Sequence, residues 1–219
     1  MADSTYNLGH VFWLGGPPCA GKTSLSEVLA SRFELDVYHA DEAFAAHARR
    51  LDPALHPTLT RWCASSWNEC WARPVESLVR DAIACCQEHF TLVLEDVLAT
   101  PADKPLLVEG AALLPRQVAG VLSGRSRAIW VVPAPDFQRG HYSKREWVGA
   151  IVGQCDDPEA ALRSWVARDA GLARWVAAEA GALGMGLLQI DGSRTLEENA
   201  AEVAAYFRLP AHLRARPTR

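Results

Sequence analysis

The sequence lacks the features of a secreted, membrane-spanning or broadly polyanion-binding protein. Its formal net charge is −4, so there is no positive excess to attract nucleic acid or an anionic membrane surface. No stretch approaches the roughly 20 apolar residues of a membrane span. Residues 1–10 are too polar for a secretory signal. We therefore expect neither a nucleic-acid partner nor a membrane association.

The sequence also lacks the cysteine spacings that hold metal or redox centres. Its six cysteines form no CxxC pair and no Cys/His pattern suited to zinc. Free thiols are the simplest interpretation, and they favour a cytoplasmic protein, because the cytoplasm is reducing. For the oligomeric state, both a monomer and a homodimer stay open.

The 219 residues are enough for one compact domain, which we expect to span residues 1–219 with a small inserted lobe. The expected strands are residues 10–16, Val37–Ala40, Leu106–Val108, Ala128–Val132 and Leu187–Ile190. The expected helices are Thr23–Phe33, most of residues 42–100, Pro158–Ala182 and residues 195–207. This alternation predicts an α/β fold in which helices cover both faces of a parallel sheet.

Two segments are harder to place. Thr91–Val97 could be a strand that ends in the acids Glu95 and Asp96, but its apolar residues keep a helical period with the segment before it. We therefore favour a helix there. Residues 136–157 are polar and rich in arginine and glycine, and we expect them to form a loop or lid.

One motif has a specific chemical meaning. Residues Gly16–Thr23 match GxxxxGK[ST] in full, directly after an expected strand and before an expected helix. Such a loop aims main-chain N–H groups and a helix N-terminus at phosphate oxygens, its lysine reaches the terminal phosphates, and its hydroxyl binds Mg²⁺. The residues expected to bind a nucleotide here are Gly16, Pro18, Cys19, Ala20, Gly21, Lys22, Thr23 and Ser24.

The order of the segments resembles that of the P-loop small-molecule kinases, a superfamily that includes adenylate kinase, shikimate kinase, gluconate kinase and chloramphenicol phosphotransferase. The resemblance rests on the P-loop at Gly16–Thr23, a short second strand followed by Asp41, a helical insert and an arginine-rich segment. Only the P-loop is specific at the level of residues. The resemblance implies a five-stranded parallel sheet in the order 2-3-1-4-5, with ATP and Mg²⁺ as ligands.

Two acids follow expected strands, at the end where open α/β sheets bind ligands. In the kinases that the chain resembles, an acid at the position of Asp41 contacts the acceptor hydroxyl or Mg²⁺. We expect Asp41 to orient that hydroxyl and accept its proton, the alternative being a plain helix N-cap. Glu109 stands where P-loop enzymes hold a Mg²⁺-bound water, the alternative being a cap for residues 110–113. Glu95 and Asp96 would take this role only if Thr91–Val97 were a strand.

The arginine-rich segment supplies the expected closing residues. Transfer of a phosphoryl group needs cations near the phosphoryl oxygens, and it needs residues that close the active site so that water is excluded. Arg139 and Arg145, with His141 and Lys144 between or beside them, lie where the resembled kinases carry their lid. We expect Arg139 and Arg145 to be catalytic; for each, the alternative is a solvated surface charge.

The resemblance also implies three further nucleotide contacts. Arg168 lies on the expected helix that follows the lid, and Gly192 and Arg194 lie in the loop after the fifth expected strand. For Arg168, the alternative is an ion pair with the adjacent Asp169. For the loop, the alternative is an ordinary turn between a strand and a helix.

In the resembled kinases the insert after the second strand holds the acceptor, which assigns residues 42–75 to an acceptor lobe. Trp67 and Trp71 are four residues apart and share a helix face, so they could wall a pocket for a flat substrate. Core packing is the alternative for this pair. Arg61 could grip an anionic acceptor, but no fixed motif identifies one.

These features predict an ATP-dependent kinase that transfers the γ-phosphoryl group to a hydroxyl of a small molecule, such as a metabolite, a nucleoside or an antibiotic-like compound. One alternative is a nucleoside monophosphate kinase, in which arginines of the insert would grip the acceptor's phosphate. A second is a regulatory nucleotide-binding protein with no small acceptor. The sequence has no NKxD-type guanine motif, which argues against a GTPase switch.

Overall fold

The computed structural model describes residues 6–142 and 145–210. Its five strands form one sheet in the order β2-β3-β1-β4-β5, and every neighbouring pair is parallel. The strands are β1 (Val11–Gly15), β2 (Asp36–His39), β3 (Leu106–Gly110), β4 (Ala128–Pro133) and β5 (Gly186–Ile190). This confirms the strand order 2-3-1-4-5 and the α/β class expected from the sequence.

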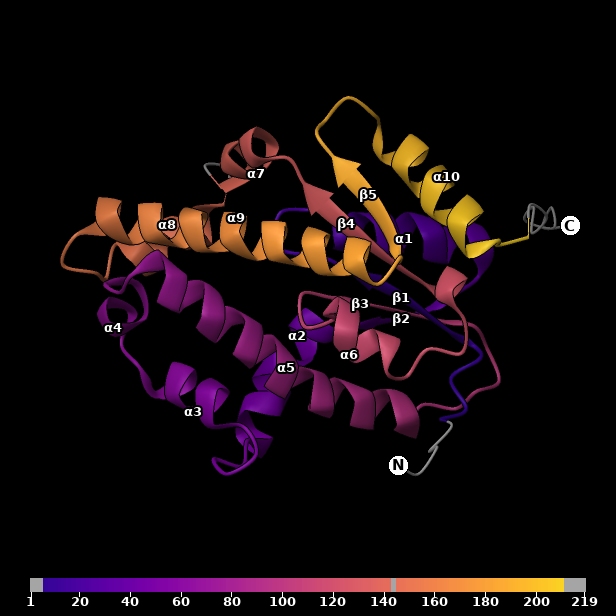
Figure 1. The fold of residues 1–219 in the computed structure, drawn as a ribbon, viewed down its shortest axis with the longest axis horizontal. Coiled ribbons are helices and arrows are strands. Elements are labelled where there is room, and N and C mark those ends of the chain that lie inside the picture. The colour runs from indigo at the N-terminus through magenta and orange to yellow at the C-terminus, as the bar shows by residue number, and fades with distance from the viewer. Residues whose placement is uncertain (1–5, 143–144, 211–219) are drawn as a thin grey trace, which may run out of the picture.

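Helices connect the strands and lie on both sides of the sheet (Figure 1). The α-helices are α1 (Lys22–Phe33), α2 (Ala40–His47), α3 (Pro57–Ala64), α4 (Trp67–Trp71), α5 (Val75–Ala99), α6 (Pro115–Ala119), α7 (Pro135–Tyr142), α8 (Glu146–Val152), α9 (Pro158–Ala182) and α10 (Leu196–Phe207). Two 3₁₀ turns are η1 (Ala48–Arg50) and η2 (Arg125–Arg127). Thr91–Val97 lies within α5, as the helical period indicates.

The two faces of the sheet carry separate apolar cores. Along β1, Val11 and Trp13 pack under α5, α6 and α9, whereas Phe12 and Leu14 pack under α1 and α10. Successive side chains of a strand point to opposite faces, so a strand covered on both faces must be apolar throughout. This is why β1 and β4 consist of short unbroken apolar runs and can be recognised in the sequence.

A third core lies beyond the sheet, at the end where the P-loop sits. Trp71 of α4, Tyr142 of α7, Val148 of α8 and Trp165 of α9 pack there against Cys19. These helices are grouped around one end of α9 (Figure 1). The packing therefore ties the insert and the segment after β4 to the P-loop.

The expectation of a loop at residues 136–157 was wrong in part. Helices α7 and α8 occupy much of this range, and each buries residues four apart: Gln138 and Tyr142 in α7, and Val148 and Val152 in α8. Each helix has only about two turns, so its buried face shows just one repeat among polar residues. The periodicity was too short to be recognised. Lys144 lies outside the described residues.

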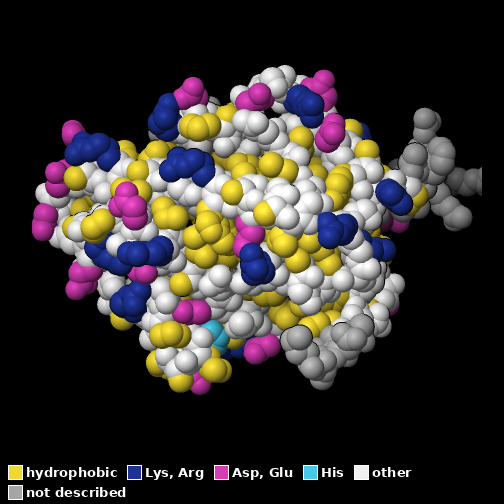
Figure 2. All heavy atoms as spheres, in the orientation of Figure 1, with side chains coloured by type: hydrophobic (Ala, Val, Ile, Leu, Met, Phe, Trp, Pro, Cys, Tyr) yellow, Lys and Arg dark blue, Asp and Glu magenta, His cyan; other side chains and the backbone are white. Residues whose placement is uncertain are grey.

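The surface carries both signs of charge. Figure 2 shows Lys and Arg side chains interspersed with Asp and Glu over the face that it presents. In the described parts of the chain, no helix combines the length and the apolar character needed to cross a membrane.

β4 passes so close to the backbone of Gly16 that a side chain at this position would clash with it. The φ of Gly16 is +146°, and a Cβ built on it would lie 2.1 Å from the carbonyl oxygen of Val131. Gly16→Ala should therefore lower the free energy of unfolding by roughly 1–3 kcal/mol, measured by urea denaturation. Gly149→Ala is the matched control, because a Cβ there meets nothing within 4 Å and the residue lies in α8. Equal stability of the two variants would contradict this account of the turn.

Candidate active site

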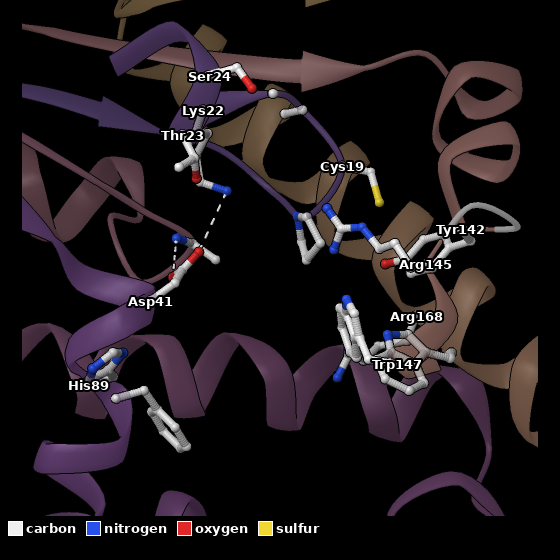
Figure 3. A pocket seen from close by; sticks show the side chains of 16 residues that line it. Cys19, Lys22, Thr23, Ser24, Asp41, His89, Tyr142, Arg145, Trp147 and Arg168 are labelled. Atoms are coloured by element: carbon white, nitrogen blue, oxygen red, sulfur yellow. Dashed lines mark hydrogen bonds and ion pairs between the residues drawn. The ribbon is translucent and has the colours of Figure 1, made fainter. Parts of the chain in front are cut away.

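A cavity of about 690 Å³ opens where the P-loop follows β1, and we call it the main cavity (Figure 3). It brings together residues from the P-loop, the start of α2, the segment around α8, and α9. The predicted site residues that line it are Pro18, Cys19, Ala20, Gly21, Lys22, Thr23, Ser24, Asp41, Arg145 and Arg168. Most of the expected nucleotide and catalytic residues therefore share one cavity.

The P-loop has the backbone of an anion-binding turn. Cys19 and Gly21 both take left-handed conformations, with φ of 66° and 76°. Gly21 is the N-cap of α1, and no side chain caps this helix. The first N–H groups of a helix have no partner within it, and they carry the positive end of the helix dipole. This helix start is therefore suited to hold phosphate oxygens.

Lys22 and Asp41 face each other across the mouth of the P-loop (Figure 3). The ammonium nitrogen of Lys22 lies 3.8 Å from Oδ2 of Asp41 and donates a hydrogen bond of 3.3 Å to the carbonyl of Pro17. The Oδ1 atom of Asp41 accepts a hydrogen bond from the backbone N–H of Ala111 at 2.9 Å. This bond fixes the carboxylate, whose side chain is still 51% exposed to the cavity.

The N-cap alternative for Asp41 was wrong. The N-cap of α2 is His39, and Asp41 lies within the first turn of the helix. Its side chain holds the backbone just after β3 instead of an N–H of its own helix. The expected strand at Val37–Ala40 ends one residue early, because Ala40 already belongs to α2.

Glu109 is buried at the end of β3, directly behind Thr23. Its Oε1 accepts a hydrogen bond from the Thr23 hydroxyl at 3.2 Å and lies 2.8 Å from Nδ1 of His39. The contacts of Glu109 are thus with Thr23 and His39, not with residues 110–113, so the capping alternative was wrong. Its other oxygen, Oε2, is buried without a hydrogen-bond partner among the described residues.

These oxygens fit a magnesium ion bound together with a polyphosphate. Mg²⁺ is usually held by one or two protein oxygens, with phosphates and water supplying the rest. Within residues 6–142 and 145–210, no group of three or more His, Cys, Asp or Glu could hold a metal. A buried carboxylate oxygen without a partner, beside a hydroxyl and near Asp41, is the arrangement such a shared site needs.

The opposite wall of the main cavity is cationic and aromatic (Figure 3). The guanidinium of Arg168 is held by the buried carboxylate of Asp169, with contacts of 2.7 and 2.6 Å, and lies 4.7 Å from the ring centre of Trp71. The guanidinium of Arg145 lies 5.6 Å from the ring of Trp147. Arg168 therefore forms the ion pair with Asp169 and also lines the cavity, and its contact with a nucleotide stays a prediction.

One predicted catalytic residue and two predicted nucleotide contacts lie outside this cavity. Arg139 forms an ion pair with Asp136 on the exposed side of α7, and Arg194 lies 3.3 Å from Glu202 of α10. Gly192 has a φ of +85° in the turn after β5. None of the three lines the main cavity, so the catalytic role of Arg139 and the nucleotide contacts of Gly192 and Arg194 stay predictions.

The predicted acceptor contacts of the insert are also apart from the cavity. Arg61 is exposed and pairs with Asp81 at 2.9 Å. Trp71 is buried and stacks on Trp165 with ring centres 4.3 Å apart, and Trp67 packs against the same cluster. The two tryptophans thus take part in core packing, as the alternative held.

A second cavity of about 180 Å³ adjoins the first, and we call it the side cavity. Both cavities are lined by Asp41, His89 and Arg168. The other walls of the side cavity are mainly apolar and include Phe44, Leu59, Trp62, Cys85, Cys86 and Leu172. The side cavity therefore combines mainly apolar walls with a few polar side chains, among them Asp41.

Sequence reasoning missed several residues that line the main cavity. They include His89 on α5, Trp147 on α8 and Trp165 on α9. His89 is a polar residue within the buried stripe of an otherwise apolar helix face, and this was the available signal. The two tryptophans gave none, because their segments have no pattern that marks a binding wall.

Farther along α5, three donors converge on the carboxylate of Asp96. Tyr38 donates at 2.8 Å, Arg50 at 2.9 Å, and Nε2 of His47 lies at 2.9 Å. Burial raises the pKa of Asp96, but the hydrogen bonds from His47, Arg50 and Tyr38 outweigh it and lower this pKa to about 2. Asp96 therefore connects α5 to β2 through Tyr38 and to α2 through His47.

The low pKa of Asp96 predicts a specific loss of stability in acid. Because the folded-state pKa of about 2 lies below the ordinary 3.8, the stabilisation is present above pH 3.8 and is lost as the pH falls through 2. Unfolding free energies from urea titrations at pH 4.5 and pH 2 should differ by roughly 1–2 kcal/mol more in the wild type than in Asp96→Asn. The exposed Asp103→Asn is the control and should keep the wild-type difference. An unchanged difference in Asp96→Asn would contradict the assignment.

A five-stranded parallel sheet in the order 2-3-1-4-5, with a P-loop between β1 and α1, defines the fold of the P-loop kinases. No protein-family profile matches the chain, and no curated protein matches it. Solved structures with a similar fold include an unliganded sugar kinase from Janibacter sp. HTCC2649 and a shikimate kinase from Acinetobacter baumannii in complex with shikimate.

The likeness to these structures is distant. The sugar kinase is 14% identical, with a TM-score of 0.46, and the match covers 91% of this chain and 94% of that chain. The shikimate kinase is 16% identical, with a TM-score of 0.42 and coverage of 88% and 89%. At these values the likeness concerns the fold alone. The chemistry must be argued from the site itself.

Proposed function

We propose that the protein is a kinase that transfers the γ-phosphoryl group of ATP to a hydroxyl of a small molecule. One observation carries the proposal: Lys22 and the exposed carboxylate of Asp41 face each other in one cavity, with two arginines on its far wall. A phosphate-binding lysine beside a carboxylate that is free to accept a proton is what transfer to a hydroxyl requires.

Each group has a role that follows from its position. The P-loop N–H groups and the start of α1 hold the phosphates, and Lys22 exchanges its contact with Asp41 for the terminal phosphates. Thr23 and Glu109, with Asp41, would hold Mg²⁺, which neutralises phosphate charge when bound. Asp41 then orients the acceptor's hydroxyl and takes up its proton as the new P–O bond forms, while the bond from the γ-phosphorus to the bridging oxygen breaks and ADP leaves.

The far wall supplies closure and further positive charge. Arg168 is pinned between Asp169 and Trp71, so it offers a fixed cation at little entropic cost. Arg145 is the N-cap of α8 and lies next to Trp147, which is 50% exposed. We propose that residues 136–157 act as the lid, bringing Arg145 over the phosphates and excluding water.

The acceptor is proposed to enter the side cavity beneath the helices of residues 42–75. Its hydroxyl would reach Asp41, which lines both cavities. The apolar walls formed by Phe44, Leu59 and Trp62 favour an acceptor with an apolar or flat body.

A panel of hydroxyl-bearing metabolites, nucleosides, antibiotics and nucleoside monophosphates tests the proposal. A thermal-shift screen with MgATP selects compounds that bind, because a ligand of the folded state raises the melting temperature. ³¹P NMR then identifies the product. We expect a new phosphate ester of a hydroxyl compound. A nucleoside diphosphate made from a monophosphate would instead indicate a nucleotide kinase, and release of inorganic phosphate alone would indicate a regulatory nucleotide-binding protein.

A further inference from the structure

His39 reaches the buried carboxylate behind the P-loop from the neighbouring strand. It is the last residue of β2 and the register partner of Glu109 in β3. Register partners on adjacent parallel strands project their side chains from the same face of a sheet, so this pairing brings the imidazole to the carboxylate. Nδ1 of His39 lies 2.8 Å from Oε1 of Glu109. The side chain of His39 is 26% exposed and that of Glu109 only 2%.

The carboxylate of Glu109 is held through one of its two oxygens. Oε1 has two partners, the imidazole of His39 and the hydroxyl of Thr23, which donates at 3.2 Å. Oε2 is buried and has no hydrogen-bond partner in the described part of the chain. The contact with His39 engages Oε1 whichever of the two atoms carries the proton between them. His39 therefore supplies one of the two polar contacts that hold this side chain in place.

A glutamate needs such support more than an aspartate does. P-loop enzymes commonly hold Mg²⁺ with the hydroxyl of the P-loop and an aspartate. Glu109 stands beside the hydroxyl of Thr23, but its side chain has one more rotatable bond than aspartate has. Each additional bond gives the carboxylate more rotamers, and fixing one of them costs conformational entropy on metal binding. The two contacts at Oε1 select one position before the metal binds.

We propose that His39 is a positioning residue that holds Glu109, and through it the hydroxyl of Thr23, in the arrangement that binds the Mg²⁺ of the nucleotide. This inference rests on the proposed function and concerns the metal at the same site. Thr23 lines the main cavity, and its hydroxyl proton is directed to Glu109, so the lone pairs of its oxygen stay available to a cation. His39 lines neither cavity. It therefore acts on the affinity for the metal, and not on the affinity of the P-loop for phosphate.

Calorimetry with AMP-PNP, a non-hydrolysable ATP analogue, separates the binding of metal from the binding of phosphate. The affinity is measured in EDTA and again in MgCl₂, and the ratio of the two is the contribution of Mg²⁺. His39→Leu should lower this ratio about tenfold, the usual loss when a residue that orients a metal ligand is removed. Its affinity in EDTA should stay at the wild-type value, which also shows that the variant is folded. His39→Asn keeps an amide N–H close to the position of Nδ1 and should retain most of the ratio.

His10→Leu is the matched control. His10 is a half-buried histidine that directly precedes β1, so it lies at the opposite end of the same parallel sheet. Its replacement should leave both affinities unchanged. An equal contribution of Mg²⁺ in the wild type and in His39→Leu overturns the inference. An equal loss in His39→Leu and His39→Asn also overturns it, because the hydrogen bond at Nδ1 would then not be what matters.

NMR of the wild-type protein with Mn²⁺ in place of Mg²⁺ gives a test that needs no variant. Paramagnetic Mn²⁺ broadens the signals of nuclei close to it. With AMP-PNP bound, we expect Mn²⁺ to broaden the ring signals of His39 and to leave those of His10 sharp; equal signals of the two rings overturn the inference. A wild type that binds AMP-PNP in neither EDTA nor MgCl₂ would overturn the proposed nucleotide site as well, whereas the other outcomes concern His39 alone.

Discussion

Lys22→Ala should lower phosphoryl transfer at least about 10²-fold while leaving the protein folded. The ammonium group has two contacts, a 3.3 Å bond to Pro17 and a 3.8 Å ion pair with the half-exposed Asp41. Losing one such hydrogen bond costs about 1 kcal/mol of stability. Removing a preorganised cation from developing phosphate charge costs a factor of about 10²–10³ in rate. The transfer rate and the urea-unfolding free energy, measured on the same preparation, separate the two effects.

Lys104→Ala is the matched control for this experiment. Lys104 is exposed in the loop before β3 and lies away from both cavities. Its replacement removes the same charge and side chain, so it should leave the transfer rate unchanged. Wild-type turnover in Lys22→Ala would contradict the mechanism, whatever the stability of the variant.

Asp41→Asn should lower transfer by about 10²–10⁴-fold and still bind ATP. Asparagine keeps an oxygen that can accept the hydrogen bond from the N–H of Ala111, so the backbone after β3 should hold its position. An amide cannot take up the proton of the acceptor's hydroxyl, and loss of a general base costs about 10²–10⁴-fold in rate. Calorimetry checks that the variant still binds ATP, and a product assay on the same preparation checks that transfer is lowered.

Glu42→Gln supplies the comparison for Asp41→Asn. Glu42 is the next residue of α2, is exposed, and does not line either cavity, so the same change of charge there should leave transfer intact. Full activity of Asp41→Asn would contradict a catalytic role for Asp41. The residue would then serve only to hold the backbone N–H of Ala111.

The fold was largely predictable, because its strands are short, apolar and buried on both faces. β1 and β4 stand out as unbroken apolar runs, and the P-loop motif fixes the junction between β1 and α1. The long helix α5 was predicted over Thr91–Val97 because its apolar period continues from the residues before it. Helices α7 and α8 were not recognised, since each is only about two turns long.

Residues of the main cavity could be predicted where a motif or the end of a strand fixes the backbone. The P-loop supplies its own lysine and hydroxyl, and Asp41 and Glu109 could be placed at the ends of strands. The sequence could not show that Arg168 lines the cavity, because the position of its guanidinium depends on contacts with Asp169 and Trp71.

His89 was beyond prediction for the same reason. Its place in the cavity wall depends on its contact with His47, which in turn contacts Asp96, and these residues are 42 and 7 positions away in the sequence. Only the packing of α5 against α2 brings the two imidazoles together. A histidine in a buried helix face can serve packing as well as binding, so the sequence alone does not distinguish the two.

Isothermal titration calorimetry of the wild-type protein with MgATP tests the central claim most directly. The claim is that the main-chain N–H groups of Gly16–Thr23 and the ammonium group of Lys22 bind a polyphosphate anion. We predict a heat of association with one site per chain, which Lys22→Ala weakens at least about tenfold. The absence of any heat with every magnesium–nucleotide pair would contradict the account.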